Sequence, residues 1–207
     1  MSNYELNIDF KESDLSMIYA AGEKVVVVKH TAGDQDKQVA WLTFKPFAHN
    51  TIQWQENYAV YASDTELQGG AAINKLSDKE AATKVVYGFD KGYFGTATPC
   101  NDLEENSYGI KNDMAGYPLL TFGLAQDVTV NGRAFANNPI NAISIPYGQS
   151  ANMTPIEKVD VYLRKDVDDG TVISHIMSVA LPVTYGEGEN VHSIEYDGSI
   201  GKFYPVK

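Results

Sequence analysis

Apolar side chains recur at every second position in several short segments, which is the period of a β-strand with one buried face. The clearest examples are residues 4–10 (YELNIDF), 51–54 (TIQW), 57–62 (NYAVYA) and 157–163 (EKVDVYL). Residues 15–19 are expected to form a further strand that pairs with 4–10. The pattern therefore predicts a protein built mainly from strands.

Two segments depart from simple alternation. Residues 23–30 (EKVVVVKH) form an unbroken β-branched run, which predicts a strand covered on both faces. Residues 64–84 are polar, and Ser77 followed by Glu80 matches the capping box that begins a helix. Either a short helix or a mobile loop fits this polar segment.

Turn residues and composition favour an all-β fold. Asn131-Gly132 lies between apolar alternations, a combination typical of a β-hairpin, and Asp90-Lys91 and Asp197-Gly198 mark two further turns. The chain has 17 Gly, 8 Pro and 13 Tyr, which suits turn-rich β structure better than helices. With 43% hydrophobic residues over 207 positions, it can bury a substantial core.

Landmarks of the first half return in the second half in the same order. Leu-Thr-Phe occurs at 42–44 and again at 120–122. A Tyr, four residues, a Gly and an aromatic residue two positions later occur at 87–94 and at 196–203. These matches predict an internal duplication, and two unrelated β segments within one sandwich are the alternative.

The domain prediction follows from the duplication and from one polar segment near the midpoint. Residues 98–116 are rich in acidic and turn residues and read as a linker. We therefore predict two tandem antiparallel β-sandwich units, an N-terminal one over 1–99 and a C-terminal one over 117–207, joined by the linker region 98–116.

Charge and cysteine content restrict the partners and the compartment. The formal net charge is −11, and the only arginines, Arg133 and Arg164, lie apart, so nucleic acid is not expected as a partner. Cys100 is the only cysteine, which excludes an intrachain disulfide. No secretory signal is visible, and no apolar run reaches the ~18 residues of a membrane span. A cytoplasmic protein without a transmembrane segment is expected.

Signatures of catalysis and of metal binding are weak. The four histidines lack metal-binding spacing, and Cys100 has acidic neighbours, which do not favour a reactive thiolate. The acidic segments 34–36 and 166–170 resemble solvated turns more than calcium loops, because the EF-hand spacing is absent. Paired glycosidase carboxylates converge in space and cannot be selected from the sequence. We expect no enzyme, no cofactor and no metal.

Aromatic residues beside amides are the best candidates for a binding site. Residues 41–63 form the densest aromatic segment, and the tryptophans Trp41 and Trp54 have no counterpart in the second half. Tyr and Trp suit sugar-binding sites and protein interfaces, although a core position is the simpler explanation for both tryptophans. The ligand-binding residues predicted from this difference between the halves are Trp54, Gln55, Glu56, Asn57 and Tyr58.

Three functions fit these features. The first is a non-enzymatic, lectin-like binding protein whose partner is a carbohydrate or a protein surface. The second is a self-assembling cytosolic protein for structure or storage, which would form a homo-oligomer. The tyrosine content, the predicted duplication and the lack of catalytic signatures favour it. The third is a cytolytic or insecticidal toxin, since many such proteins are β-rich and lack signals.

Overall fold

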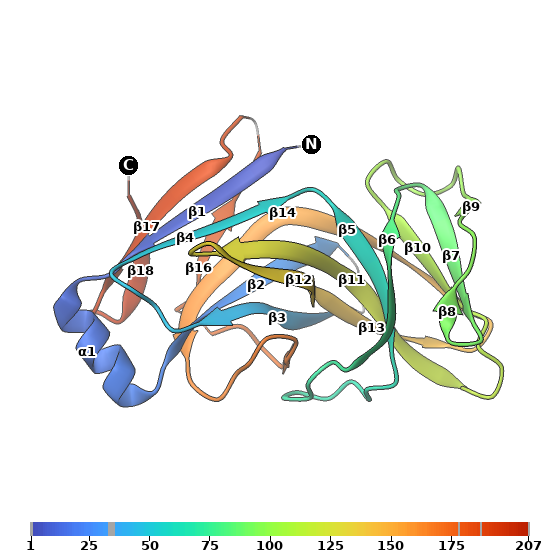
Figure 1. Ribbon diagram of the computed structural model, residues 1–207, viewed down its shortest axis with the longest axis horizontal. Helices are drawn as coiled ribbons and strands as arrows, with labels where there is room; N and C mark the ends of the chain where they lie inside the picture. The colour runs from blue at the N-terminus through green and yellow to red at the C-terminus, as the bar shows by residue number, and fades with distance from the viewer. Residues whose placement is uncertain (1, 33–35, 178, 187, 207) are drawn as a thin grey trace.

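The computed structural model describes residues 2–32, 36–177, 179–186 and 188–206, and within these it is an all-β protein with a single helix. Eighteen strands are defined in the described part of the chain, and they form an elongated molecule of packed sheets (Figure 1). No helix in these ranges is long and apolar enough to cross a membrane.

The first sheet combines strands from both ends and from the middle of the chain. Leu6 of β1 lies opposite Ile52 of the antiparallel β4, whereas Ile8 lies beside Ile194 of the parallel β17. Both β4 and β5 run along β11. The strands of this sheet are β18 (Lys202–Val206), β17 (Val191–Asp197), β1 (Asn3–Asp9), β4 (His49–Gln55), β5 (Tyr58–Ser63), β6 (Lys75–Ala81), β11 (Leu119–Val130), β12 (Arg133–Pro139) and β13 (Asn141–Pro146).

The second sheet is centred on the pairing of β2 with β14, in which Val27 lies opposite Val161. Strand β3 pairs with the other edge of β2, and β16 pairs with β14. Short contacts of β3 with β13 and β15 complete it. These strands are β2 (Lys24–Ala32), β3 (Lys37–Phe44), β14 (Ser150–Arg164), β15 (Val172–Ile173) and β16 (Leu181–Thr184).

A smaller group of strands lies at the end drawn in green on the right of Figure 1. Ile110 of β10 lies beside Tyr87 of the parallel β7 and opposite Ala151 of β14, so this group continues from the second sheet. Its strands are β7 (Val85–Asp90), β8 (Tyr93–Phe94), β9 (Thr98–Pro99) and β10 (Tyr108–Asn112).

The valine run of β2 is covered on both faces, as predicted. Val25 and Val27 belong to the main core between the two sheets, whereas Val26 and Val28 pack in a second cluster with Tyr162. All four valines have at most 1% of their surface exposed. Successive side chains of a strand point to opposite faces, so a continuous apolar run requires two cores.

The strand expected at residues 15–19 is wrong, because Glu12–Ala21 forms helix α1. Leu15 and Ile18 are buried at helical spacing, while Met17 is 56% exposed. Gly22 ends the helix in the left-handed conformation at φ 71°, where its N–H donates to the last helical carbonyls.

The helix expected to begin at Ser77 is also wrong, and the alternative of a loop over 64–84 is wrong for residues 75–81, because these residues form strand β6. Its side chains alternate between half-buried and exposed, and Asp78 lies opposite Tyr61 of β5. Every residue of β5 is buried, so its backbone groups need partners on both sides. Tertiary hydrogen bonding overrides the local helix signal here.

Hydrogen bonds and packing join the two halves that the sequence predicted as separate sandwiches. Strand β1 pairs with β17, β2 with β14 and β5 with β11, and one core cluster contains residues from both halves. Within 98–116, Leu103, Tyr108 and Ile110 are buried, so the expected linker contributes to the core. The observed arrangement is one composite set of sheets.

The internal duplication stays a prediction. The Leu-Thr-Phe of the first half lies in β3 of the second sheet, and that of the second half lies in β11 of the first sheet. The other pair of landmarks lies in the hairpins β7–β8 and β17–β18, but their registers differ, because Phe94 faces Phe89 in the first hairpin and Phe203 faces Tyr196 in the second.

Candidate functional site

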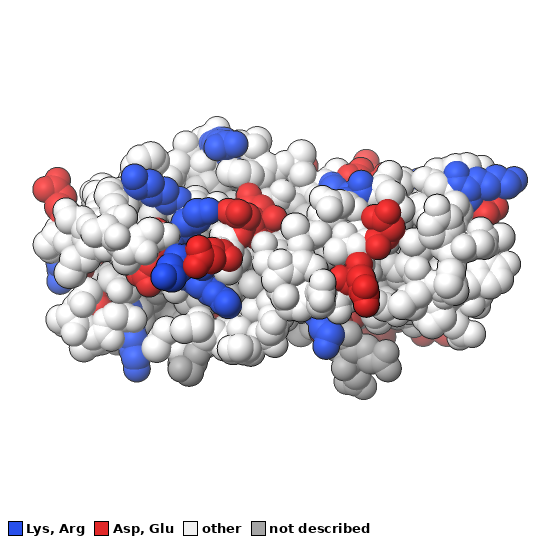
Figure 2. Space-filling model, turned by 90° about the horizontal axis from the view of Figure 1, so that it is seen from below, with Lys and Arg blue, Asp and Glu red and all other residues white. Residues whose placement is uncertain are grey.

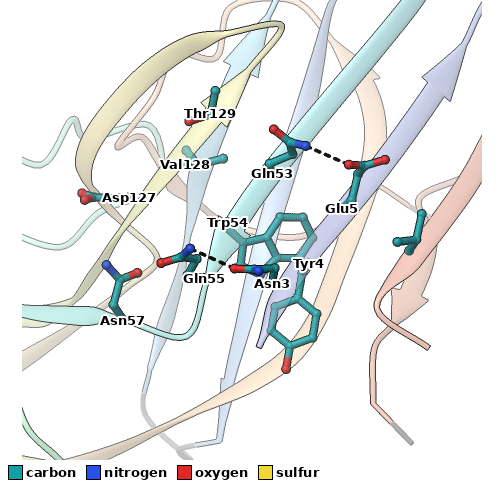
Figure 3. Close-up of a pocket in the computed structure, with 11 residues that line it drawn as sticks. Asn3, Tyr4, Glu5, Gln53, Trp54, Gln55, Asn57, Asp127, Val128 and Thr129 are labelled. Atoms are coloured by element: carbon teal, nitrogen blue, oxygen red, sulfur yellow. Dashed lines mark hydrogen bonds between the residues drawn. The ribbon is translucent and has the colours of Figure 1, made fainter. Parts of the chain in front are cut away.

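A groove of about 520 Å³ lies on the outer face of the first sheet, where β17, β1, β4 and β11 run side by side (Figure 3). The side chains that point outward from these strands are mostly amides, carboxylates and hydroxyls, while Tyr4, Trp54 and Val128 lie beneath them. The groove is lined by Asn3, Tyr4, Glu5, Gln53, Trp54, Gln55, Asn57, Asp127, Val128, Thr129 and Val191.

Three of the five predicted site residues line this groove: Trp54, Gln55 and Asn57. Trp54 is only 4% exposed, so its ring forms part of the floor and offers no open stacking surface. Strand β4 ends at Gln55 and β5 begins at Tyr58, so the predicted site residues do not lie on one continuous strand.

The other two predicted residues point elsewhere. Glu56 is exposed and accepts a hydrogen bond of 2.7 Å from the Tyr4 hydroxyl. Tyr58 is 5% exposed, and its hydroxyl donates to Oε1 of Glu157 inside the core at 2.5 Å. Trp54 and Tyr58 thus both point into the core, whereas Glu56 lies at the surface.

Two cross-strand pairs hold the polar side chains of the groove in place. Nε2 of Gln53 donates to Oε2 of Glu5 at 2.8 Å, and Nε2 of Gln55 donates to Oδ1 of Asn3 at 2.8 Å. Both pairs follow from the antiparallel register of β1 and β4, which sets these residues opposite each other. Hydrogen bonds from Asn7 and then Gln53 hold the pKa of Glu5 below its ordinary value.

The polar surface continues past the end of the groove. Asn57 and Asp127 border both the groove and a neighbouring depression of about 250 Å³, which Glu80 and Asn137 also line. Oδ1 of Asp127 accepts a hydrogen bond of 2.7 Å from the Asn137 backbone, which fixes the carboxylate between the two hollows. The two hollows together form an extended polar surface.

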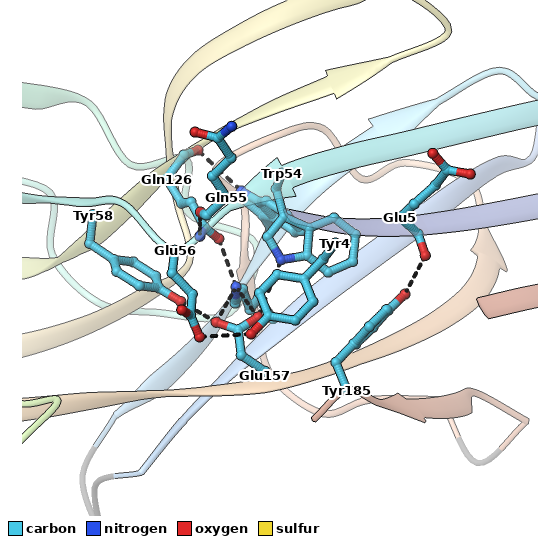
Figure 4. A network of polar contacts seen from close by, with 11 residues as sticks. Tyr4, Glu5, Trp54, Gln55, Glu56, Tyr58, Gln126, Glu157 and Tyr185 are labelled. Carbon is cyan, nitrogen blue, oxygen red and sulfur yellow. Dashed lines mark hydrogen bonds and ion pairs between the residues drawn. The ribbon is translucent and has the colours of Figure 1, made fainter. Parts of the chain in front are cut away.

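A buried polar cluster lies directly behind the groove (Figure 4). Nζ of Lys29 donates to Oε1 of Gln126 at 2.8 Å and to Oε1 and Oε2 of Glu157 at 3.0 and 2.9 Å. The Lys29 side chain has no exposed surface, and that of Glu157 has 15%. We call Lys29, Gln126 and Glu157 the core triad.

Aromatic rings enclose the core triad. The Lys29 ammonium lies 5.5 Å from the centres of the Trp41 and Trp54 rings and 5.2 Å from that of Tyr58. Nε1 of Trp54 also donates to Oε2 of Glu157 at 3.2 Å. Cation–π attraction and these hydrogen bonds offset part of the cost of burying the charges.

Burial changes the acidity of these groups. Desolvation lowers the pKa of Lys29 to about 8, although the neighbouring Glu157 carboxylate acts in the opposite direction. Burial also raises the pKa of Tyr58 strongly, and the Glu157 carboxylate adds to that rise. The amine of Lys29 is thus much easier to deprotonate than an ordinary lysine.

Sequence reasoning missed the core triad, although a signal was present. Each residue occupies an inward position on a strand whose other inward positions are apolar: Lys29 follows Val25 and Val27, and Gln126 follows Phe122 and Leu124. Glu157 precedes Val159 and Val161 in the same way, with a register shift between β14 and β2 at this point. A polar residue that interrupts such a stripe marks a buried polar site.

The acidic segments considered for calcium binding have structural partners. Asp168 pairs with Lys24 at 2.5 Å, and Oδ1 of Asp169 accepts from the Thr43 backbone. Asp36 accepts hydrogen bonds from Thr31 and Asn141, while Asp34 and Gln35 lie outside the described residues. In the ranges that the structure covers, no three His, Cys, Asp or Glu side chains gather in a way that could hold a metal ion.

Charged side chains of opposite sign are mixed on the surface. Figure 2 shows a face on which Lys and Arg lie beside Asp and Glu. A second groove of about 520 Å³ is also mixed, since Lys24, Lys45 and Arg133 line it together with Asp168 and Asp169. Local mixing of this kind produces no extended positive field, and the expectation that nucleic acid is not a partner stays a prediction.

Comparisons of the chain with protein-family models, with curated proteins and with solved structures find no match. The structure therefore defines the class, an all-β protein with an outward polar groove, and the function has to be argued from that groove.

Proposed function

We propose that the protein is a non-enzymatic, lectin-like binding protein that holds a carbohydrate in the groove over β1, β4 and β11. The observation that carries this proposal is the row of amide and carboxylate side chains fixed by the Gln53–Glu5 and Gln55–Asn3 hydrogen bonds. Planar groups that both donate and accept are suited to the hydroxyls of a sugar.

The fixed geometry favours binding further. Each cross-strand pair uses one donor and one acceptor, and the exposed carboxamides of Asn3, Gln53 and Gln55 retain other polar atoms for a ligand. Rigid strands hold these groups, so little conformational entropy is lost when a ligand binds. Val191, which is 61% exposed at the groove, offers an apolar contact for the C–H face of a sugar ring.

The shape of the site suggests an oligosaccharide. The groove and the neighbouring depression share Asn57 and Asp127, so a chain of several sugar units can lie across both. We propose binding without chemical conversion and, on the grounds of the sequence, in the cytosol.

A glycan array with folded protein, followed by calorimetry with the oligosaccharide that gives the strongest signal, tests this function. The double variant Gln53→Ala, Gln55→Ala is expected to bind about tenfold more weakly or worse, since ~1.4 kcal/mol is tenfold in affinity. Gln149→Ala is the matched control, because Gln149 is exposed and lies outside the groove. A blank array, or equal affinities of the double variant and the control, contradicts the proposal.

Self-assembly is the second candidate, and one exposed apolar patch favours it. Tyr117, Leu119 and Tyr147 are 46%, 52% and 54% exposed. They lie together because Leu119 pairs with Pro146 and the Tyr147 backbone donates to Pro118. Exposed aromatics of this kind are typical of protein interfaces.

Sedimentation analysis distinguishes this second candidate from a plain binding protein. The wild type is expected to form dimers or larger species, and the double variant Tyr117→Ser, Tyr147→Ser to be a monomer. Tyr93→Ser, at an equally exposed tyrosine of β8, serves as the control and should leave assembly unchanged. A wild-type monomer at high concentration argues against self-assembly.

A further inference from the structure

The core triad holds the three groups that an acyl transfer within one chain requires. Lys29 supplies an amine, Gln126 a carboxamide and Glu157 a carboxylate, and both partners lie within 3.0 Å of the amine nitrogen. The Lys29 and Gln126 side chains are fully buried in the main core. Held reactants of this kind gain greatly in effective concentration.

The carboxamide of Gln126 is fixed at both ends. Its Oε1 accepts from the Lys29 amine at 2.8 Å, and its Nε2 donates to the Gln55 backbone carbonyl at 2.6 Å. The Lys29 amine thus already contacts the carboxamide whose carbon, Cδ, it is to attack. For the attack, the amine has to leave its hydrogen bond at Oε1 and approach Cδ from the face of the carboxamide.

Electrostatics and burial also favour reaction over a permanent ion pair. Burial lowers the pKa of Lys29 to about 8, so a substantial share of the amine is neutral and nucleophilic in mildly alkaline solution. The aromatic rings of Trp41, Trp54 and Tyr58 surround the amine and keep water from competing with it. A buried ion pair, by contrast, stabilises a fold no better than apolar side chains of the same volume.

We propose that Lys29 and Gln126 form an isopeptide bond, with Glu157 as the general base. This bond joins β2 of the second sheet to β11 of the first sheet, across 97 positions of the sequence. It is a self-processing step of the folded chain and is independent of ligand binding in the groove.

The reaction balances without any further reagent. The Lys29 ammonium transfers a proton to Glu157, and the lone pair of the neutral amine attacks Cδ of Gln126. The attacking nitrogen of the tetrahedral intermediate then loses a second proton. Glu157 passes both protons of Lys29 to Nε2 of Gln126. The bond from Cδ to Nε2 breaks, and that nitrogen leaves as ammonium. A new amide joins Nζ of Lys29 to Cδ of Gln126, and Glu157 is a carboxylate again.

Mass spectrometry of the folded wild type, incubated in mildly alkaline buffer and then digested with trypsin, tests the proposal. The sequence places trypsin sites so that the product is the peptide 25–37 joined to the peptide 112–133, with the cleavage after Lys29 blocked. The joined pair is expected to weigh the sum of its two parts less one ammonia. Loss of ammonia alone is not decisive, because Asn131-Gly132 can also lose it by cyclisation.

Three variants separate the roles of the triad. Lys29→Arg keeps the positive charge beside Glu157 but lacks the nucleophilic amine. Gln126→Asn keeps the amide but moves its carbon away from Lys29. Both variants are expected to give only separate peptides. Glu157→Gln keeps the amine and the acyl group but removes the base, so the yield of the joined peptide should fall at least tenfold. Lys24→Arg, in an exposed ion pair, is the control and should cross-link as the wild type does.

The wild-type result decides the proposal even where a variant fails to fold. Folded wild type that yields only separate peptides overturns it. A joined peptide that has lost water and contains Glu157 overturns Gln126 as the acyl donor. Full cross-linking in Glu157→Gln overturns the assigned role of Glu157.

Discussion

Oε2 of Glu157 lies 2.9 Å from Nζ of Lys29 inside the core that joins the two sheets. The two residues come from the paired strands β14 and β2, and a register shift between Ile156 and Val159 lies at Glu157. Such an irregularity re-aims the side chains of the inserted residues, and here Glu157 points towards the Lys29 ammonium. The strand pairing of the second sheet thus creates the polar centre of the molecule.

Removal of the Glu157 carboxylate is expected to destabilise the protein severely. Glu157→Ala leaves the Lys29 ammonium without its counter-ion and deprives the Tyr58 hydroxyl of its acceptor. Breaking a buried pair from one side costs about 3–5 kcal/mol, and loss of the proposed isopeptide bond would add to this. Chemical denaturation measures the free energy of unfolding.

The control for this prediction is Lys24→Ala, which removes the exposed pair with Asp168. Exposed pairs contribute about 0–1 kcal/mol, so the control should lie close to the wild type. Similar losses in the two variants would show that the core triad is no more important to stability than a surface pair.

Both tryptophans are expected to be shielded in the native protein. Trp41 and Trp54 are 0% and 4% exposed, and their rings meet edge to face with centres 5.5 Å apart. Native emission should therefore lie at short wavelength, and acrylamide should quench it much less than it quenches the unfolded chain. Strong quenching of the folded protein would instead indicate an exposed ring of the kind that sugar stacking needs.

Local sequence signals predicted the parts of the fold that depend on neighbouring residues. Asn131-Gly132 forms the expected hairpin turn between β11 and β12, with φ angles of 50° and 80°. The valine run of β2 is buried on both faces as expected, since Val25 and Val26 pack in different clusters. Side-chain period and turn chemistry act over a few residues, so they can be read directly.

Strand partners and the candidate site depend on contacts between distant residues, and the sequence did not show them. Nothing in the local pattern indicates that β1 lies parallel to β17, or that Glu5 faces Gln53 across β1 and β4. Aromatic density at Trp54 did not indicate whether its ring is exposed. The ring lies in the floor of the groove, and the amides beside it form the accessible surface.

Gly123 is predicted to tolerate no side chain. A Cβ atom at this position of β11 would lie 2.2 Å from the Asn141 carbonyl oxygen and 2.7 Å from the Tyr61 hydroxyl, which hydrogen-bond to each other. Gly123→Ala should thus cost about 1–3 kcal/mol or more through overpacking. Gly95→Ala is the matched control, because its Cβ would meet only a carbonyl at 3.7 Å. Thermal melts that coincide for the two variants would contradict the packing around Tyr61.

The last prediction concerns the acidity of Glu5 in the groove. Hydrogen bonds from Asn7 and from Gln53 lower the pKa of this carboxyl below its ordinary value of 4.5. A carboxyl whose pKa is lower in the folded state than in the unfolded state binds fewer protons when folded, so it contributes stability above pH 4.5. That contribution is lost as the pH falls through the folded pKa.

An NMR titration of the Glu5 side chain follows this effect directly. Asn7→Ala should raise the pKa most, Gln53→Ala should raise it less, and both variants should lose less stability than the wild type on acidification. Gln149→Ala, outside the groove, should leave the titration unchanged. An unchanged pKa in both Asn7→Ala and Gln53→Ala would mean that the two hydrogen bonds do not persist in solution. The groove would then lack the fixed geometry on which its proposed sugar binding rests.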